Sequence, residues 1–224
     1  MKPIQTICLA GCLLLVAGCA REKVVRPVTP QETGMQQELL VELNRVRANP
    51  RGYVPILEEH KQGFTGNRKY IAKNVILLTQ EGVKPVDEAI EFLKQSPAVP
   101  ALKLSAGMSQ AARDHVLDLG PEGKIGHFGT DGSSPGERLQ RYGKPVGWVA
   151  ENIAFGDANG RNMVMILLVD DGVPDRGHRK KMLSGQYQQV GIACGAHKVY
   201  RHMCVIDFAE KFVEKVVTSL DTDP

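Results

Sequence analysis

The chain has 224 residues, with 28 basic and 25 acidic side chains and a formal net charge of +3. This near-neutral balance, without a dense block of lysine and arginine, argues against nucleic acid or another polyanion as the main partner. The length suits one domain with an insertion or a tether, and is sufficient to bury a sizeable core. Because aromatic residues make up only 5% of the chain, aliphatic side chains must fill that core.

The N-terminus has the pattern of an export signal. Lys2 precedes an uncharged apolar run over Ile4–Ala17, and small residues lead to Cys19. This run is shorter than the roughly 20 residues that a membrane-spanning helix needs. The ending Val16-Ala17-Gly18-Cys19 resembles the bacterial lipobox, which implies cleavage before Cys19 and acyl chains on that cysteine. An ordinary cleaved signal peptide and a short helical anchor are the alternatives.

The sequence divides into four parts by composition. Pro27, Pro30 and mixed charges without periodicity predict a flexible tether after the cysteine. Ala20 follows Cys19 where an Asp would indicate retention in the inner membrane, so the outer membrane is favoured. The predicted parts are a lipoprotein signal peptide (1–18), a lipidated tether (19–33), a folded domain with a helical insertion at about 51–100 (34–212), and a C-terminal tail (213–224).

The folded domain is expected to begin with an amphipathic helix. Thr33 can cap a helix over 34–48, which ends at Asn49-Pro50. The insertion that follows has a broken pattern: a short helix near 53–61, an apolar strip at 75–78 and an amphipathic helix near 86–94.

A helix is predicted over 105–119 in the middle of the chain. It places His115 on its apolar stripe, where a histidine is more often a hydrogen-bonded core residue than a ligand. Ser134-Pro135-Gly136-Glu137 has the pattern of a capping box at a helix start. The loop 126–132 is therefore held against a helix end.

The second half of the domain alternates strands and helices. A strand over 149–155 carries Glu151 in an otherwise apolar stretch, and seven apolar residues at 163–169 predict a buried helix. Asp170 and Asp171 end that helix, where the helix dipole disfavours anions. A short helix bearing His178 and two strands, at 189–195 and 202–209, close the domain.

Only two cysteines remain once Cys19 and the signal are set aside. Cys194 and Cys204 lie ten positions apart across a predicted hairpin, and an oxidising compartment favours a disulfide between them. Two buried free thiols are the alternative, and a zinc pair is disfavoured by the long spacing. His197 and Tyr200, in the turn between the two strands, are expected to be exposed.

Several separate segments together resemble the CAP superfamily, also called the SCP domain, which includes cysteine-rich secretory, antigen 5 and pathogenesis-related 1 proteins. The resemblance covers roughly 37–212 and implies an α+β fold, a three-layer α-β-α sandwich with a small antiparallel sheet between helices. The segments that carry it are Gly126-His127, Asp131-Gly132-Ser133-Ser134-Pro135, Ala150-Glu151-Asn152-Ile153-Ala154, Gly177-His178-Arg179 and Val190-Gly191-Ile192-Ala193.

The resemblance also implies a cavity lined by two histidines and two acids, which in some members binds a divalent metal. His127, Glu151 and His178 match three of these positions, and Asp170 or Asp171 stands in place of the fourth acid. The metal site expected here is His127, Glu151, His178 and Asp171, with zinc as the first choice. Two imidazoles and a carboxylate suit zinc and leave a position for water or a ligand.

These observations favour a binding module in the cell envelope. The chain is expected to be an exported lipoprotein, anchored in the membrane by its N-terminal lipid, with a cavity for a divalent metal and a small apolar, sterol or lipid ligand, or for an envelope protein. The alternative is a metal-dependent hydrolase of peptides or esters. The sequence alone leaves open whether the protein is an enzyme, because fold resemblance does not fix function.

Overall fold

The computed structural model of the protein describes residues 29–72 and 75–215. The predicted signal peptide, the acylation at Cys19 and most of the predicted tether lie outside these ranges. Within the described part of the chain, no helix is both long and apolar enough to cross a membrane.

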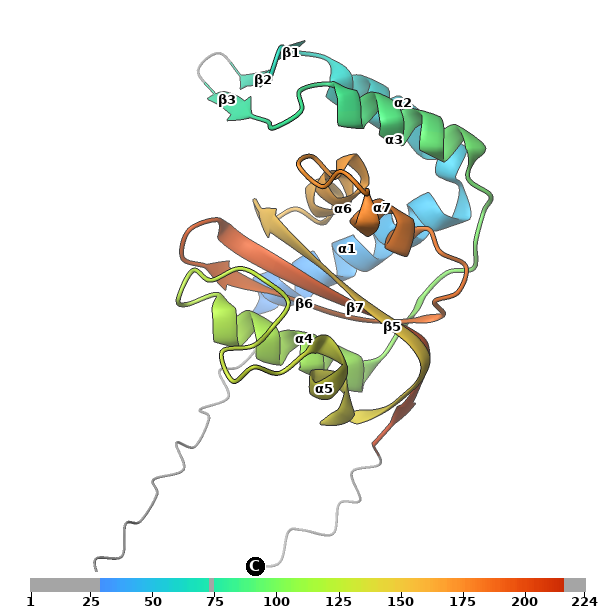
Figure 1. The fold of residues 1–224 in the computed structure, drawn as a ribbon, viewed down its shortest axis with the longest axis vertical. Coiled ribbons are helices and arrows are strands. Elements are labelled where there is room, and N and C mark those ends of the chain that lie inside the picture. Colours follow the sequence, from blue (N-terminus) through green and yellow to red (C-terminus); the bar gives the residue numbers. More distant parts are fainter. Residues whose placement is uncertain (1–28, 73–74, 216–224) are drawn as a thin grey trace, which may run out of the picture.

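A four-stranded sheet forms the centre of the domain (Figure 1). Its order is β4-β6-β7-β5, and all pairs are antiparallel except β4 with β6. β5 and β7 are 14 residues each and exceed the predicted strands, so that β7 also takes in the first two residues of the predicted tail. The strands are β4 (Lys103–Leu104), β5 (Gly143–Gly156), β6 (Gln189–His197) and β7 (Arg201–Glu214).

Helices cover both faces of this sheet (Figure 1). α1 packs on β6 and α6 packs on β5, whereas α4 packs on β6 and β7 on the opposite face. This arrangement confirms the predicted α-β-α sandwich. The helices of the first face are α1 (Pro30–Ala48), α6 (Gly160–Val169) and α7 (Gly177–Met182), and those of the second are α4 (Ala106–Leu119) and α5 (Pro135–Gln140).

The first helix begins four residues earlier than the sequence pattern suggests. Thr29 is its N-cap: the Thr29 hydroxyl accepts a hydrogen bond from the Glu32 amide, and the Glu32 carboxylate accepts one from the Thr29 amide. Pro30 occupies the first turn, where a missing N–H costs nothing. The prediction that Thr33 caps this helix was wrong because Pro30 looked like part of the tether.

The insertion contains strands as well as helices. β1, β2 and β3 form an antiparallel sheet of their own, between α2 and α3 in the chain. Strands of two to five residues are too short to show a clear alternation, so the sequence pattern did not reveal this sheet. α3 packs against α6, which places the insertion on the outer side of the first helical layer (Figure 1). The elements are α2 (Pro50–Lys61), β1 (Phe64–Thr65), β2 (Arg68–Ala72), β3 (Val75–Leu78) and α3 (Lys84–Gln95).

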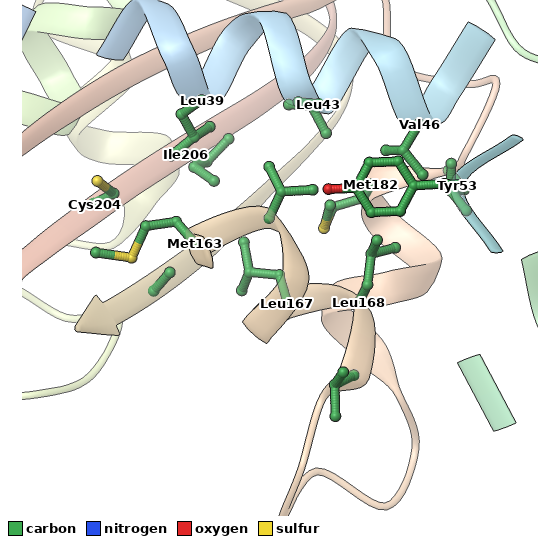
Figure 2. Packing of buried hydrophobic residues seen from close by; sticks show 14 of the residues in the cluster. Leu39, Leu43, Val46, Tyr53, Met163, Leu167, Leu168, Met182, Cys204 and Ile206 are labelled. Atoms are coloured by element: carbon green, nitrogen blue, oxygen red, sulfur yellow. The ribbon is translucent and has the colours of Figure 1, made fainter. Parts of the chain in front are cut away.

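The main core lies between the sheet and the layer of α1 and α6. Figure 2 shows side chains from both helices and from β7 meeting there. Because this layer is enclosed by the sheet on one side and by the insertion on the other, α6 is apolar on most of its surface, as its sequence predicts. The labelled residues include Leu39, Leu43, Val46, Met163, Leu167, Leu168 and Ile206.

The closing hairpin carries the predicted disulfide. Cys194 on β6 and Cys204 on β7 are direct cross-strand partners, with Cα atoms 4.1 Å apart, and are joined through their sulfur atoms. In the turn, Tyr200 is 46% exposed but His197 is only 2% exposed, so the prediction for His197 was wrong. Its ring packs between Phe155 and Tyr200 and bonds to the Lys124 carbonyl, which accounts for its burial.

Candidate functional site

The first histidine of the predicted site pairs with the predicted glutamate. His127 Nδ1 lies 2.6 Å from Glu151 Oε1. The loop that carries His127 is fixed by Arg138 of α5, whose guanidinium donates to the carbonyls of His127 and Ser133 and to Glu151 Oε2. The side chains of Arg138 and Glu151 are each 1% exposed, so this ion pair is buried beneath a histidine that remains 44% exposed.

The capping box predicted for α5 is present and positions this arginine. Ser134 accepts from the Glu137 amide, and the Glu137 carboxylate accepts from the Ser134 amide. Arg138 follows Glu137 in the helix. The cap that orders the loop therefore also fixes the backbone from which the Arg138 side chain extends.

The second histidine pairs with an aspartate at the end of α6. His178 Nδ1 lies 2.6 Å from Asp170 Oδ1, and Asp170 Oδ2 accepts from the amides of His178 and Arg179. Asp170 is the C-cap of α6, with a φ of +60°, and this left-handed conformation turns its carboxylate toward the start of α7. A carboxylate at the end of α6 is therefore compensated by amide donors from the next helix.

Asp171, the acid expected to complete the metal site, binds the insertion instead. Its carboxylate oxygens accept from the backbone amides of Gln80 and Glu81, at 2.7 and 2.9 Å. The acid that contacts His178 is thus Asp170, the alternative at this position.

Arg176, in the loop between α6 and α7, forms ion pairs with the insertion. Its guanidinium lies 2.7 Å from carboxylate oxygens of both Glu81 and Glu88, and also donates to the carbonyls of Asp170 and Val173. These bonds hold the pKa of Glu81 at about 2, so the contact persists throughout the physiological pH range. The loop that presents Asp170 and His178 is therefore fixed by contacts with the insertion.

Two buried groups that the sequence analysis did not assign to the site lie beside Glu151. Arg138 is one of them. The other is Asp207 on β7, which is directly opposite Glu151 in the strand register and is 0% exposed. Burial and the neighbouring Glu151 carboxylate raise the pKa of Asp207 well above its usual value. An acid within the apolar stretch 203–209 was the available signal, as it was for Glu151.

His115 is the core residue that the helix pattern predicts. It is 0% exposed, and its Nε2 bonds to the Gly126 carbonyl at 2.8 Å, which ties α4 to the loop of His127. Burial lowers the pKa of His115, so its neutral form is favoured.

The donor atoms near the two histidines do not fit the predicted three-ligand metal site. Both oxygens of Glu151 and both of Asp170 are already engaged by protein donors. Over residues 29–72 and 75–215, no group of three His, Cys, Asp or Glu side chains could hold a metal ion. Zinc sites in proteins use at least three protein ligands. Metal binding by this protein remains a prediction from the family resemblance.

A pocket lies between the insertion and the body of the domain, next to the second histidine. It has a volume of about 310 Å³, at the lower end of the usual range for small-molecule sites. His60, Thr79, Asp170, Asp171 and His178 provide its polar groups. Its apolar lining consists of Phe64, Leu77 and Leu78 from the insertion, and Ile153, Ile166, Leu167, Val169 and Val173 from the body.

His60 contributes an uncharged imidazole to this pocket. Its Nδ1 is 2.6 Å from Lys69 Nζ, and Lys69 also donates to the His60 carbonyl. Burial and the positive charge of Lys69 lower the pKa of His60 to about 4. The histidine is therefore neutral at physiological pH, which suits an apolar lining.

The domain is similar in fold to solved bacterial structures. An extracellular protein containing an SCP domain from Bacillus anthracis is 19% identical, with a TM-score of 0.48, over 83% of this chain and 45% of that chain. An outer surface protein from Borrelia burgdorferi is 18% identical, with a TM-score of 0.44, over 58% of this chain and 89% of that chain. This chain thus spans less than half of the Bacillus protein.

Sequence comparisons identify the family. No curated protein sequence matches the chain. The family model described as the cysteine-rich secretory protein family, or CAP, matches residues 42–208, which is about three quarters of the 224 residues. Together with the predicted motifs and the observed sandwich, this match shows that the chain belongs to the cysteine-rich secretory protein family.

Proposed function

We propose that the protein is an exported, lipid-anchored CAP-domain binding module that takes a small apolar or lipid ligand in the pocket between its insertion and its body. The observation that carries the proposal is the pocket itself, whose lining is largely apolar and comes from both parts of the chain. Burial of an apolar ligand against these side chains supplies the binding free energy. His178, whose ring is held by Asp170 through Nδ1, provides a polar end at which a headgroup or carboxyl group can be recognised.

The anchor in this proposal is the acylated Cys19. The supporting evidence is the sequence Val16-Ala17-Gly18-Cys19 at the end of the apolar run. Export and acylation would keep the pocket close to a membrane, where acyl chains are abundant. We favour the outer membrane because Ala20 follows the cysteine.

The chemistry of the pocket supports binding over covalent catalysis. Among the described residues that line it, Thr79 alone carries a hydroxyl, which donates to the Asn67 carbonyl. An activated nucleophile needs an adjacent base, whereas the Thr79 hydroxyl donates to a backbone carbonyl and not to a histidine. We therefore assign His178 to recognition, with its ring held by Asp170.

Lipid extraction and fluorescence binding test the proposal. Mass spectrometry of lipid extracted from the purified protein is expected to find an apolar molecule in stoichiometric amount. A fluorescent fatty acid, cis-parinaric acid, should bind the wild type and bind Ile166→Asp about tenfold more weakly or worse, because a charge would enter the apolar lining. Val213→Asp is the matched control, since Val213 is 48% exposed and Ile166 45%. Empty extracts together with equal probe affinity in the two variants would contradict the proposal.

Zinc binding is tested separately. The Nε2 atoms of His127 and His178 are the ring nitrogens not engaged by Glu151 and Asp170. Calorimetric titration of zinc into the wild type and His178→Ala should show loss of affinity in the variant if the metal prediction holds. Equal affinity in both proteins would exclude the predicted site.

A further inference from the structure

Two loops at one end of the central sheet together expose apolar and basic side chains. Ile125 follows α4 and is 64% exposed, while Val199 and Tyr200, in the turn between β6 and β7, are 63% and 46% exposed. Lys124 and Lys198 flank them and are also exposed. We call these five residues the loop face. Clusters of large exposed apolar side chains mark interaction surfaces, whereas single exposed ones are normal.

The two loops are fixed to each other before any partner binds. The Lys198 amide donates to the Gly120 carbonyl at 2.9 Å, and His197 Nε2 bonds to the Lys124 carbonyl at 3.0 Å. Gly123 has a φ of +69°, and a Cβ at this position would lie 2.9 Å from Val199 Cγ2. Glycine is therefore required for this close approach, and the loop face is a preformed surface.

The loop face lies at the end of the domain where the described chain begins. Met35 of α1 contacts Cys204, and Gln36 shares a surface hollow with Cys194, so the start of α1 lies against the hairpin near its turn. In Figure 1, the start of α1, the loop after α4 and the β6–β7 turn all lie toward the left of the view, at one end of the sheet.

The length of the preceding chain limits how far this end can lie from a membrane. Ten residue steps lead from Cys19 to the N-cap Thr29. A chain of that length spans at most about 35 Å. If Cys19 is acylated, the end of the domain that carries the loop face is therefore the end held near the lipid.

The charges around the loop face favour an anionic lipid surface. Lys124, Lys198 and Arg201 are basic, and the acidic groups beside them are Glu122 and Asp157. Arg201 and Asp157 neutralise each other in an ion pair of 2.7 Å. Two lysines therefore remain against one glutamate, next to aliphatic and aromatic side chains that suit the interfacial zone of a bilayer.

We propose that the loop face docks on the surface of a bilayer containing anionic lipid, so that the anchored domain has a fixed orientation on the membrane. The proposal rests on the proposed lipid anchor for its geometry. Ile125, Val199 and Tyr200 enter the headgroup region, and Lys124 and Lys198 contact lipid phosphates. The insertion and its pocket are then held at a defined height above the lipid.

Vesicle binding by the chain without its anchor tests the loop face alone. A protein that begins at residue 20 contains every residue that the structure describes. This protein should co-sediment with vesicles of phosphatidylethanolamine and phosphatidylglycerol. The double variant Ile125→Asp/Val199→Asp should bind about tenfold more weakly or worse. In this variant, two charges replace apolar side chains that would enter the headgroup region of the bilayer. Val41→Asp is the matched control, since Val41 is 66% exposed on α1.

A second measurement needs no substitution. Amide hydrogen exchange of the same wild-type protein, with and without vesicles, should show added protection at 123–126 and 197–201 and none at the distant β5 bulge near 146–149. Failure of the wild type to bind vesicles, equal loss in Val41→Asp, or protection elsewhere would overturn the proposal and indicate a protein partner for this surface. The intact mass of full-length protein from membranes tests acylation of Cys19 independently, so failure of the anchor and failure of the loop face are distinguishable.

Discussion

The two sides of the central sheet differ in where their buried charges lie. On the side toward α1 and α6, Leu43 and Ile206 belong to a large apolar core (Figure 2), and the buried charges Arg47 and Arg179 lie on the helices α1 and α7. The face toward α4 and α5 buries charge in addition to its apolar side chains: Arg138, Glu151 and Asp207 are all at most 4% exposed. Asp207, which faces this side, lies beside the Glu151 carboxylate, and burial together with that carboxylate raises its pKa.

The two sides of the sheet therefore depend on different interactions for their stability. Apolar burial stabilises the first face by about 25 cal/mol per Å². On the second face, the cost of removing charges from water offsets much of what the ion pair returns. The histidine His127 is held by this second, costly face, whereas His178 is held by Asp170 at the edge of the apolar one.

The largest expected effect comes from breaking the buried ion pair. Arg138→Met should lower the free energy of unfolding by about 3–5 kcal/mol, because Glu151 would remain buried without its partner. Urea denaturation measures this loss. The double variant Arg138→Met/Glu151→Gln should recover a large part of it. A single variant that loses less than about 1 kcal/mol would mean that Glu151 is not dependent on this arginine.

On the apolar face, a cavity should cost nearly as much. Leu43→Ala is expected to lower the free energy of unfolding by about 2–5 kcal/mol, since Leu43 is 0% exposed. Val41→Ala, two residues earlier on the same helix and 66% exposed, should change stability by less than about 0.5 kcal/mol. Similar losses in both variants would contradict the position of the core.

Removing the disulfide should have a smaller effect. Cys194→Ala/Cys204→Ala opens a short loop of ten residue steps, and loop-closure entropy predicts a loss of about 2–3 kcal/mol. Thermal unfolding of the variant, compared with the wild type under oxidising and reducing conditions, measures it. No change on either removal or reduction would show that the bond is absent from the folded protein.

Sequence patterns predicted the elements of both faces well, because α-helical periodicity and apolar strands are local signals. The capping box at Ser134 and the helix over 105–119 are examples that the structure confirms. The pattern failed where strands were very short, as in β1–β3, and where Pro30 concealed a helix start.

The site was predicted less completely because its contacts depend on strand register and on one backbone angle. Nothing local shows that Asp207 lies opposite Glu151; that follows only from the pairing of β5 with β7. Asp170 and Asp171 are equivalent by sequence, and the positive φ of Asp170 decides which of them contacts His178. Arg138 joins the site because the capped helix directs it back to the loop of His127.

The smallest expected effect has the opposite sign and tests the polar face directly. Because the pKa of Asp207 is raised in the folded protein, Asp207 keeps its proton above about pH 4, where the unfolded chain loses it. The folded state then binds more protons than the unfolded state, so this group lowers stability as pH rises from about 4 toward its folded pKa.

Asp207→Asn removes that proton requirement while keeping the shape of the side chain. The variant should therefore be more stable than the wild type by about 1–2 kcal/mol at pH 7, because an amide has no proton whose loss favours the unfolded chain, and the difference should shrink toward zero near pH 4. Urea denaturation at pH 4, 5.5 and 7 measures the trend. Asp87→Asn, at an exposed position paired with Lys61, should show little change at any of these values. If Asp207→Asn were instead less stable at pH 7, Asp207 would be ionised and partnered in the folded protein, and the polar face would contribute to stability as the apolar face does.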